Sequence, residues 1–302
     1  MLLYKSGIKG CLARQPQPKS DFTFSRNTTY GLGGRAPVAY YPKNLVEARR
    51  VVDELNSTGK EFVVIGNGSN ILASDSGFNG AVISTKKLSG VINRGDRLVC
   101  LAGTKIGTVL AYCKKHNLGG LEYLNGIPAS MGGAAYMNAG VGGDCIGNDI
   151  LSVAVYDKKT RIISQKSCNF GYRRSTMRDI NALILCVTVK IRPSSSEEID
   201  EKTNYYKSRR AHLPKGRSCG CVFKNPQGIS AGLLIENANL KGLSVGGAFV
   251  SPEHANFIIN NGGTASDVKT LIETVRTKVF EKFGVLLREE VVYIGEFNEF
   301  NS

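Results

Sequence analysis

The stretch "GLEYLNGIPASMGGAAYMNAGVGGD", residues 120–144, combines many glycines with small and apolar residues. Its glycines stand at positions 120, 126, 132, 133, 140, 142 and 143. A surface loop would be more polar, and a helix would exclude so much glycine. We therefore expect an irregular backbone pressed closely against something large and flat. Glycine-rich packing of one domain against another is the alternative.

A second glycine-rich stretch lies upstream, in "VVIGNGSNILASDSGFNG" at residues 63–80. A β run leads directly into Gly66, Asn67, Gly68, Ser69 and Asn70. Such small residues let consecutive backbone N–H groups converge on an anion such as a diphosphate, although an ordinary turn would look the same. A Rossmann site is not indicated, because the third glycine and the long helix are missing. The two stretches together favour a flavin dinucleotide site of another architecture.

Length and composition bound the class of protein. A chain of 302 residues exceeds one ordinary hydrophobic core, so we expect two or three domains. The N-terminus lacks a continuous apolar segment, and no later stretch approaches the roughly 20 apolar residues of a membrane span, so we expect a cytoplasmic protein.

The net charge of +14 admits nucleic-acid binding, but the basic clusters "KKTR", "GYRRSTMR" and "YYKSRRAH" lie in no recognition motif. Phosphorylated small molecules would satisfy the same charge. We expect no nucleic-acid, membrane or obligate protein partner.

The cysteines and histidines do not have the spacing of a metal site. No CxxC pair occurs, and the histidines are scattered at positions 116, 212 and 254. In a reducing compartment we expect thiols at all eight cysteines, which are residues 11, 100, 113, 145, 168, 186, 219 and 221. Cys113 and Cys186 fall on apolar faces and are expected in the core.

Hydrophobic periodicity and capping patterns predict three long helices and several strands. The helices are expected at 45–56 after the N-cap Asn44, from Ile106 to near Gly119, and at 265–283 between the cap Thr264 and Gly284. Strands are expected within 61–66, 97–103, 152–157, 161–165, 182–191 and 290–297. The polar segment 193–202 looks like an interdomain connection that runs into a helix.

Eight segments together show a family resemblance. They are "NTTYGLGG", "GNGSNIL", "GIPASMGGAAYMNAG", "FGYRRS", "GCVFKNP", "GLLIENANLKG", "GGAFVSPEHANFIIN" and "EEVVYIG", in this order between about residues 20 and 297. The chain resembles the UDP-N-acetylenolpyruvoylglucosamine reductases, flavoenzymes of bacterial cell-wall (peptidoglycan) synthesis. Only 48 positions separate Arg173 from Cys221, which indicates the shorter form of the family.

The resemblance implies an α+β protein with the FAD-binding fold of the vanillyl-alcohol-oxidase type. Two α/β subdomains, residues 21–86 and 87–193, would surround FAD, and an α+β domain, residues 194–302, would bind the substrate. Residues 1–20 form an N-terminal extension that matches nothing in the family.

The implied reaction is the NADPH-dependent reduction of UDP-N-acetylglucosamine enolpyruvate to UDP-N-acetylmuramate. NADPH gives hydride to FAD, and the flavin then gives hydride to the β-carbon of the enolpyruvyl group. The charge left on the α-carbon spreads into the adjacent carboxylate. A flavin oxidase of the same fold acting on another alcohol or sugar is the alternative. No histidine precedes His116 as an attachment point, so we expect non-covalent FAD.

Three catalytic residues follow from the resemblance. Arg173 matches the arginine that polarises the substrate carboxylate, for which a planar guanidinium is well suited. Glu290 matches a glutamate near the same carboxylate, and to help rather than repel it needs a pKa raised by burial. Without the resemblance, each would be taken for a solvated surface charge.

Cys221 occupies the place of the family serine that protonates the α-carbon. A thiol with a reference pKa of about 8.5 is mostly protonated at neutral pH and can serve as a general acid. An acidic, exposed thiol would also be open to oxidation. Cys219 is expected to be a small neighbour, and a redox partner role is the alternative.

The resemblance also implies binding residues. The expected FAD contacts are Gly66, Asn67, Gly68, Ser69, Asn70, Ile127, Pro128, Ala129, Gly132, Gly133, Asn138 and Gly140. The expected substrate contacts are Tyr172, Arg209, Lys224, Asn225 and His254, which could bond a UDP-sugar diphosphate. A thiol hydrolase built on Cys221 would need a base, and His212 and His254 lie in no recognised arrangement for one.

Overall fold

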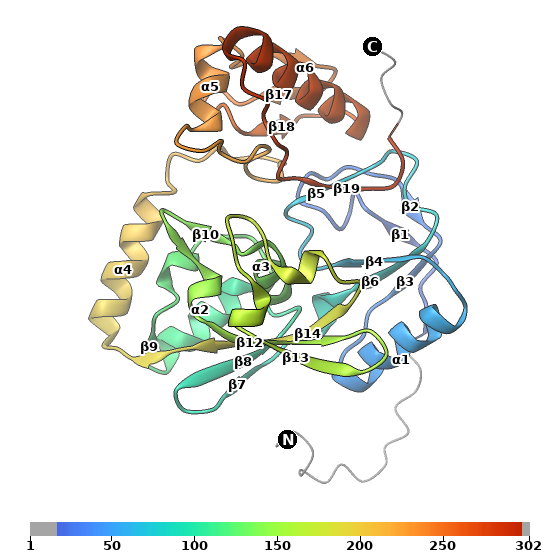
Figure 1. Ribbon diagram of the computed structural model, residues 1–302, viewed down its shortest axis with the longest axis vertical. Helices are drawn as coiled ribbons and strands as arrows, with labels where there is room; N and C mark the ends of the chain where they lie inside the picture. The colour runs from blue at the N-terminus through green and yellow to red at the C-terminus, as the bar shows by residue number, and fades with distance from the viewer. Residues whose placement is uncertain (1–16, 298–302) are drawn as a thin grey trace.

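The structure is a computed structural model and describes residues 17–297 (Figure 1). Its first unit contains a parallel sheet in the order β3 (Val38–Tyr40), β6 (Ala81–Ser84), β4 (Phe62–Ile65). Helix α1 (Leu45–Ser57) connects β3 to β4. The helix begins where Oδ1 of Asn44 accepts a hydrogen bond from the Glu47 N–H at 2.9 Å, so the predicted cap is confirmed.

The second unit is built on a five-stranded antiparallel sheet (Figure 1). Its strand order is β13 (Thr160–Ser164), β12 (Ile150–Tyr156), β14 (Leu183–Lys190), β8 (Arg97–Leu101), β7 (Val91–Asn93). Helices α2 (Ile106–Lys115) and α3 (Met131–Met137) belong to the same unit, and they bury side chains in one hydrophobic cluster with α1 and β14. The large core is therefore shared between the first two units.

The C-terminal unit follows helix α4 (Ser196–Ser208), which runs along one side of the molecule and links the two parts (Figure 1). It contains α5 (Ala231–Asn237), α6 (Ala265–Phe283) and the antiparallel sheet β16 (Ser244–Val245), β17 (Ala248–Val250), β18 (Ile258–Asn260). Thr264 and Asp267 form a reciprocal capping box at the start of α6, and Gly284 ends the helix with φ +66°. Both ends are as predicted.

Short strand pairs and single helical turns complete the described chain. The pairs are β1 (Phe22–Thr23) with β2 (Arg35–Ala36), β5 (Ile71–Ala73) with β19 (Val292–Ile294), β9 (Leu118–Gly119) with β15 (Arg192–Pro193), and β10 (Gly140–Val141) with β11 (Asp144–Cys145). The 3₁₀ turns are η1 (Thr85–Lys87), η2 (Glu122–Leu124), η3 (Ile146–Asn148), η4 (Lys166–Cys168) and η5 (Thr176–Arg178). The parallel β5·β19 pair brings residues 292–294 beside the strand that follows the loop at 66–70.

Two expectations about helices were wrong. The stretch 120–144 does contain a helix, α3. Glycine occurs within this helix because a neighbouring segment packs closely against it. A Cβ on Gly132 would lie 2.9 Å from the Cβ of Ala102. Ser130 caps this helix by accepting from the Gly133 N–H. Helix α2 ends at Lys115 rather than near Gly119, because Asn117 has a left-handed φ of +52°.

The cysteines within the described chain are all free thiols, and Cys11 lies outside it. Cys113 and Cys186 are buried, as expected. Between residues 17 and 297 no three His, Cys, Asp or Glu side chains gather as metal ligands, and no helix has the length and apolar character to cross a bilayer.

The domain limits at 86 and 193 stay a prediction. The units are not packed separately, because Tyr30, Leu32 and Leu72 of the first unit lie in the same hydrophobic cluster as residues of the C-terminal unit.

Candidate active site

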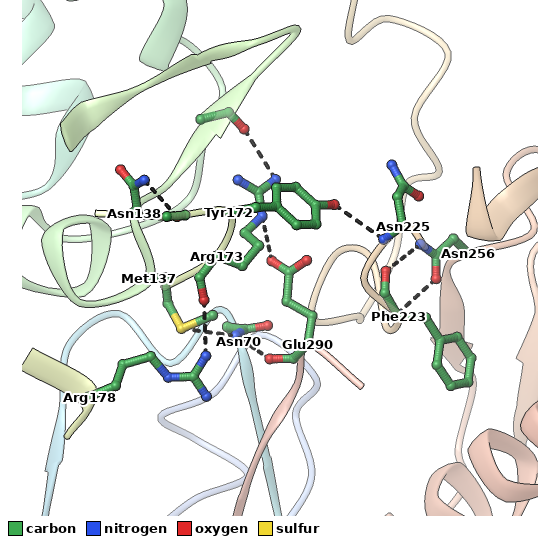
Figure 2. A network of polar contacts seen from close by, with 12 residues as sticks. Asn70, Met137, Asn138, Tyr172, Arg173, Arg178, Phe223, Asn225, Asn256 and Glu290 are labelled. Atoms are coloured by element: carbon green, nitrogen blue, oxygen red, sulfur yellow. Dashed lines mark hydrogen bonds and ion pairs between the residues drawn. The ribbon is translucent and has the colours of Figure 1, made fainter. Parts of the chain in front are cut away.

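Arg173 and Glu290 meet between the sheet unit and the C-terminal unit (Figure 2). Arg173 Nε lies 2.8 Å from Glu290 Oε1, and the two side chains are 24% and 13% exposed. Glu290 lies two residues before β19. Its N–H donates to the Val222 carbonyl at 2.7 Å, and its carbonyl accepts from Asn70 Nδ2 at 3.0 Å. Arg173 thus contacts the carboxylate, and two other chain segments hold the backbone that carries it.

Arg173 stands in a tight turn with an unusual backbone. Its φ is +53°, a left-handed conformation that costs free energy in a non-glycine residue. Gly171 and Arg174 exchange two backbone hydrogen bonds of 3.0 and 3.1 Å across it. Asn138 Nδ2 donates to the Gly171 carbonyl at 2.8 Å, and Arg178 Nη1 donates to the Arg173 carbonyl at 3.0 Å (Figure 2). The surrounding side chains therefore hold the strained turn.

Burial raises the pKa of Glu290, as the sequence analysis required. The positive charges of Arg173, Lys224 and Arg178 oppose this shift without reversing it. A raised pKa favours a carboxyl group that keeps or shares a proton beside Arg173. The group can then donate a hydrogen bond to an anion instead of repelling it.

Cys221 lies close enough to Glu290 and Arg173 for both charges to change the pKa of its thiol. It is half-buried and forms an isolated antiparallel bridge with Phe257. Burial, assisted by Glu290, raises the pKa of the Cys221 thiol to about 11, and Arg173 and Arg210 oppose the shift. This direction agrees with the expected protonated thiol and makes the thiol less open to oxidation than one with an ordinary pKa. Burial keeps the group protonated at neutral pH, which lowers its nucleophilicity but leaves it able to give up a proton.

A cavity of about 830 Å³ opens beside the Arg173 turn. Its lining residues come from the C-cap of α3, the β10·β11 hairpin, the segments 147–148, 165–166 and 169–173, and one residue of the C-terminal unit: Asn138, residues 140–145, Gly147, Asn148, Gln165, Lys166, residues 169–173 and Asn225. The Asn225 N–H donates to the Tyr172 hydroxyl at 3.2 Å, and the Arg173 guanidinium lies 5.4 Å from the Tyr172 ring centroid (Figure 2). Tyr172 and Asn225 thus meet at this cavity from different units.

The other expected substrate contacts lie at different places. Lys224 is half-buried, and burial together with Arg178 lowers its pKa. Arg209 is exposed at the end of α4, where its guanidinium approaches Gly142 on the cavity wall. His254 packs against His212 and Phe257, and its Nδ1 accepts from the Asn256 N–H. The contacts of His254 are therefore not with the Arg173·Glu290 pair.

Two arginines that were not among the expected site residues also reach this site. Arg210 is half-buried and donates to the Gly126 carbonyl at 3.2 Å. Burial lowers its pKa, and the charges of Cys221 and Arg173 also act on it. Arg178, described above, is the second. Neither position has a local signal, because both lie in runs of basic residues where only the fold decides which guanidinium turns inward.

The glycine loops converge on one side of α3. A Cβ on Gly66 would lie 2.4 Å from Ser130 Oγ, and Gly68 has φ +71° against the Asn27 carbonyl. Asn67 Nδ2 donates to the Pro128 carbonyl at 2.6 Å. Contacts within the protein thus already require glycine at 66 and 68.

These loops border a second cavity, of about 300 Å³, with a positive rim. Its lining residues are Asn67, Lys105, Gly107, Thr108, Ile127, Pro128 and Ala129. Lys86 lies outside this lining, and its Nζ donates to the carbonyl and Oδ1 of Asn27 at 3.3 and 3.1 Å. Burial and Lys105 lower the pKa of Lys86, and within residues 17–297 neither lysine is ion-paired with a carboxylate. Positive charge at this place suits a diphosphate. Lys86, Lys105 and Thr108 were missed by the sequence analysis.

Other expected FAD contacts have protein partners. Asn138 is 4% exposed, and both ends of its amide are bonded, Nδ2 to the Gly171 carbonyl and Oδ1 to the Gly147 N–H. Gly140 accepts from Arg173 Nη2 at 3.3 Å. The loop 66–70 therefore connects to the Arg173·Glu290 pair through Asn70, and α3 connects to the Arg173 turn through Asn138.

Comparison with known proteins identifies the family. Residues 36–164 match the FAD binding domain, and residues 211–294 match the C-terminal domain of UDP-N-acetylenolpyruvoylglucosamine reductase. Reductases of this name from Moorella thermoacetica and Clostridium botulinum (Hall) are each 38% identical, over 90% and 92% of this chain and 91% and 92% of theirs.

The crystal structure of the Thermus caldophilus enzyme superposes with a TM-score of 0.81 at 32% identity, covering 92% of this chain and all of that one. The expected fold is confirmed. The chain belongs to the UDP-N-acetylenolpyruvoylglucosamine reductase family and is a FAD-dependent oxidoreductase of peptidoglycan synthesis.

Proposed function

We propose that this chain reduces UDP-N-acetylglucosamine enolpyruvate to UDP-N-acetylmuramate with NADPH as the electron donor. The observation that carries the proposal is the Arg173·Glu290 pair, with Cys221 near enough for both charges to act on it, beside the 830 Å³ cavity that Arg173 lines. A guanidinium, a carboxyl with a raised pKa and a protonated thiol are the groups that reduction of an enolpyruvyl ether requires.

FAD would lie against the two glycine loops without covalent attachment. Gly66, Asn67, Gly68, Ser69 and Asn70 would face it from one side, and Ile127, Pro128, Ala129, Gly132, Gly133 and Gly140 from the other. Lys86 and Lys105 would neutralise its diphosphate. When bound, FAD supplies the ring that takes a hydride from NADPH and passes it to the β-carbon of the substrate. In this proposal residues 21–86 and 87–193 hold FAD, and residues 194–302 complete the substrate site.

The chain's own residues would stabilise the resulting charge. Arg173 would hold the substrate carboxylate through its planar fork as negative charge develops there. Glu290, protonated or sharing a proton, would donate to the same carboxylate. Cys221 would give its proton to the α-carbon, and the thiolate would be stabilised by Arg173 and Arg210.

The UDP-sugar would occupy the large cavity. Tyr172, Lys224 and Asn225 would bond its polar groups near the reacting end, and Arg209 would meet it at the Gly142 side of the cavity. His254 is proposed as a more distant contact, reached from the 251–257 loop. The positive charge of these groups suits a diphosphate.

The test is an anaerobic two-step titration of the holoenzyme. NADPH should bleach the flavin absorbance, and UDP-N-acetylglucosamine enolpyruvate should restore it with formation of UDP-N-acetylmuramate. A flavin that is reduced by NADPH but reoxidised only by oxygen would contradict the proposed reaction. Acid precipitation should release the yellow cofactor into the supernatant, whereas colour in the pellet would contradict non-covalent binding.

A further inference from the structure

Asn256 is buried behind the segment 221–225 and lines neither of the two cavities described above (Figure 2). It is 3% exposed and lies in the loop between β17 and β18. Its Oδ1 accepts from the Phe223 N–H at 2.9 Å, and its Nδ2 donates to the Phe223 carbonyl at 2.8 Å. The side-chain amide thus pairs with both backbone groups of one residue, as a neighbouring strand would.

The backbone of Asn256 continues the same pairing. Its carbonyl accepts from the Val222 N–H at 2.9 Å, next to the Cys221 to Phe257 bridge. On the opposite side, the segment is held by the Glu290 N–H on Val222 and by the Lys224 N–H on the Arg288 carbonyl. The segment carrying Cys221 therefore lies between Asn256 and the segment 288–290 that carries Glu290.

We infer that Asn256 is a positioning residue for the general acid. By fixing Phe223 it sets where Cys221 stands relative to Glu290, without touching substrate or cofactor itself. The inference rests on the proposed role of Cys221. A displacement of about 1 Å of a catalytic group can lower a rate by about 100-fold, so loss of this pairing should be visible in the reaction.

The chain offers a matched control in Asn260. This side chain is 6% exposed and also bonds two backbone groups, donating to the Tyr30 carbonyl at 3.0 Å and accepting from the Gly263 N–H at 2.9 Å. It holds the loop at Tyr30 instead of the segment 221–225. Asn256→Leu and Asn260→Leu remove the same number of side-chain hydrogen bonds from equally buried places.

The two half-reactions are followed by anaerobic stopped-flow of the holoenzyme at saturating NADPH or enolpyruvyl substrate. In Asn256→Leu we expect the limiting rate of flavin reoxidation by substrate to fall by about 10-fold or more, with flavin reduction by NADPH within about twofold of wild type. Asn260→Leu should leave the ratio of the two rates unchanged. Asn256→Asp keeps the oxygen that accepts from the Phe223 N–H and loses the amide donor. Its rate of flavin reoxidation should lie between those of wild type and Asn256→Leu. This variant also tests the inference where the leucine variant fails to fold.

Deuterium uptake by the peptide around 221–225 supplies a readout that does not depend on the reaction. It should rise in Asn256→Leu and Asn256→Asp but stay at the wild-type level in Asn260→Leu. Unchanged uptake, or equal slowing of both half-reactions, would overturn the inference while Cys221→Ala still impairs the second step. If Cys221→Ala reoxidises at the wild-type rate, the proposed function of the thiol fails, and the inference falls with it.

Discussion

The two walls of the reaction site are held in different ways. The Arg173 wall is a tight turn with a left-handed backbone, fixed by side chains of Asn138 and Arg178. The Cys221 wall is an extended segment fixed on both sides by strand-like pairing. In the proposed mechanism the strained wall presents a permanent charge that must be oriented toward the substrate carboxylate, and the extended wall presents a neutral acid that must lie close to the carbon it would protonate. Substitutions on the two walls should therefore fail differently.

The largest effect is expected from Cys221→Ala, which removes the proposed proton source by a small substitution. The enolpyruvyl half-reaction should slow by about 10³-fold, whereas flavin reduction by NADPH should be nearly unaffected. Cys221→Ser should retain substantial activity, because a hydroxyl can also donate. Anaerobic stopped-flow separates the two steps, and a wild-type rate of reoxidation in Cys221→Ala would remove the thiol from the mechanism.

Arg173→Lys tests the opposite wall with the charge retained. Lysine cannot present a bidentate fork to a carboxylate, so we expect kcat/KM for the enolpyruvyl substrate to fall by about 100-fold. Arg174→Lys is the matched control, since Arg174 is exposed and pairs only weakly with Asp179 at 3.4 Å. Steady-state kinetics of both variants decide the matter. Equal losses at 173 and 174 would mean that the inward orientation of Arg173 has no role.

Glu290→Gln tests the electrostatic difference between the two walls through the pH dependence of the free energy of unfolding. Burial raises the pKa of Glu290 above its usual value of 4.5, so the folded chain binds this proton more tightly than the unfolded chain. The contribution of Glu290 to the free energy of unfolding is therefore full below pH 4.5 and is lost as the pH rises through the raised pKa. Urea unfolding from pH 4 to 8 should show this loss in the wild type and a flatter profile in Glu290→Gln. An equally steep profile in the variant would contradict the assignment.

The local patterns predicted what local forces determine. The caps at Asn44 and Thr264 and the end at Gly284 follow from hydrogen bonds and backbone conformation within a few residues, and they were confirmed. Helix α3 was missed because Gly132 is required by close packing against Ala102, a residue about thirty positions away in the sequence.

The site shows the same division. The family motifs predicted Arg173, Cys221 and Glu290 as site residues. The inward orientation of Arg210 and Arg178 was not predicted, because it depends on tertiary packing. The rise in the pKa of Cys221 above its reference value has the same origin, since burial by distant segments causes it.

The smallest effect on catalysis is expected from Cys219→Ala, the neighbouring thiol on the same wall. Cys219 is 5% exposed and packs in the C-terminal hydrophobic cluster with Tyr30 and Val222, and burial raises its thiol pKa to about 12. Cys221 is outside that cluster and faces the charges of Arg173 and Glu290. The left-handed Gly220, with φ +83°, separates the two.

Cys219→Ala should therefore leave both half-reactions within about twofold of wild type and lower the free energy of unfolding by about 1 kcal/mol, through lost packing. Stopped-flow and urea unfolding of the same preparation measure both quantities. A defect confined to the enolpyruvyl step would show that Cys219, rather than Cys221, supplies the proton, and it would overturn the division between a packing thiol and a reacting thiol.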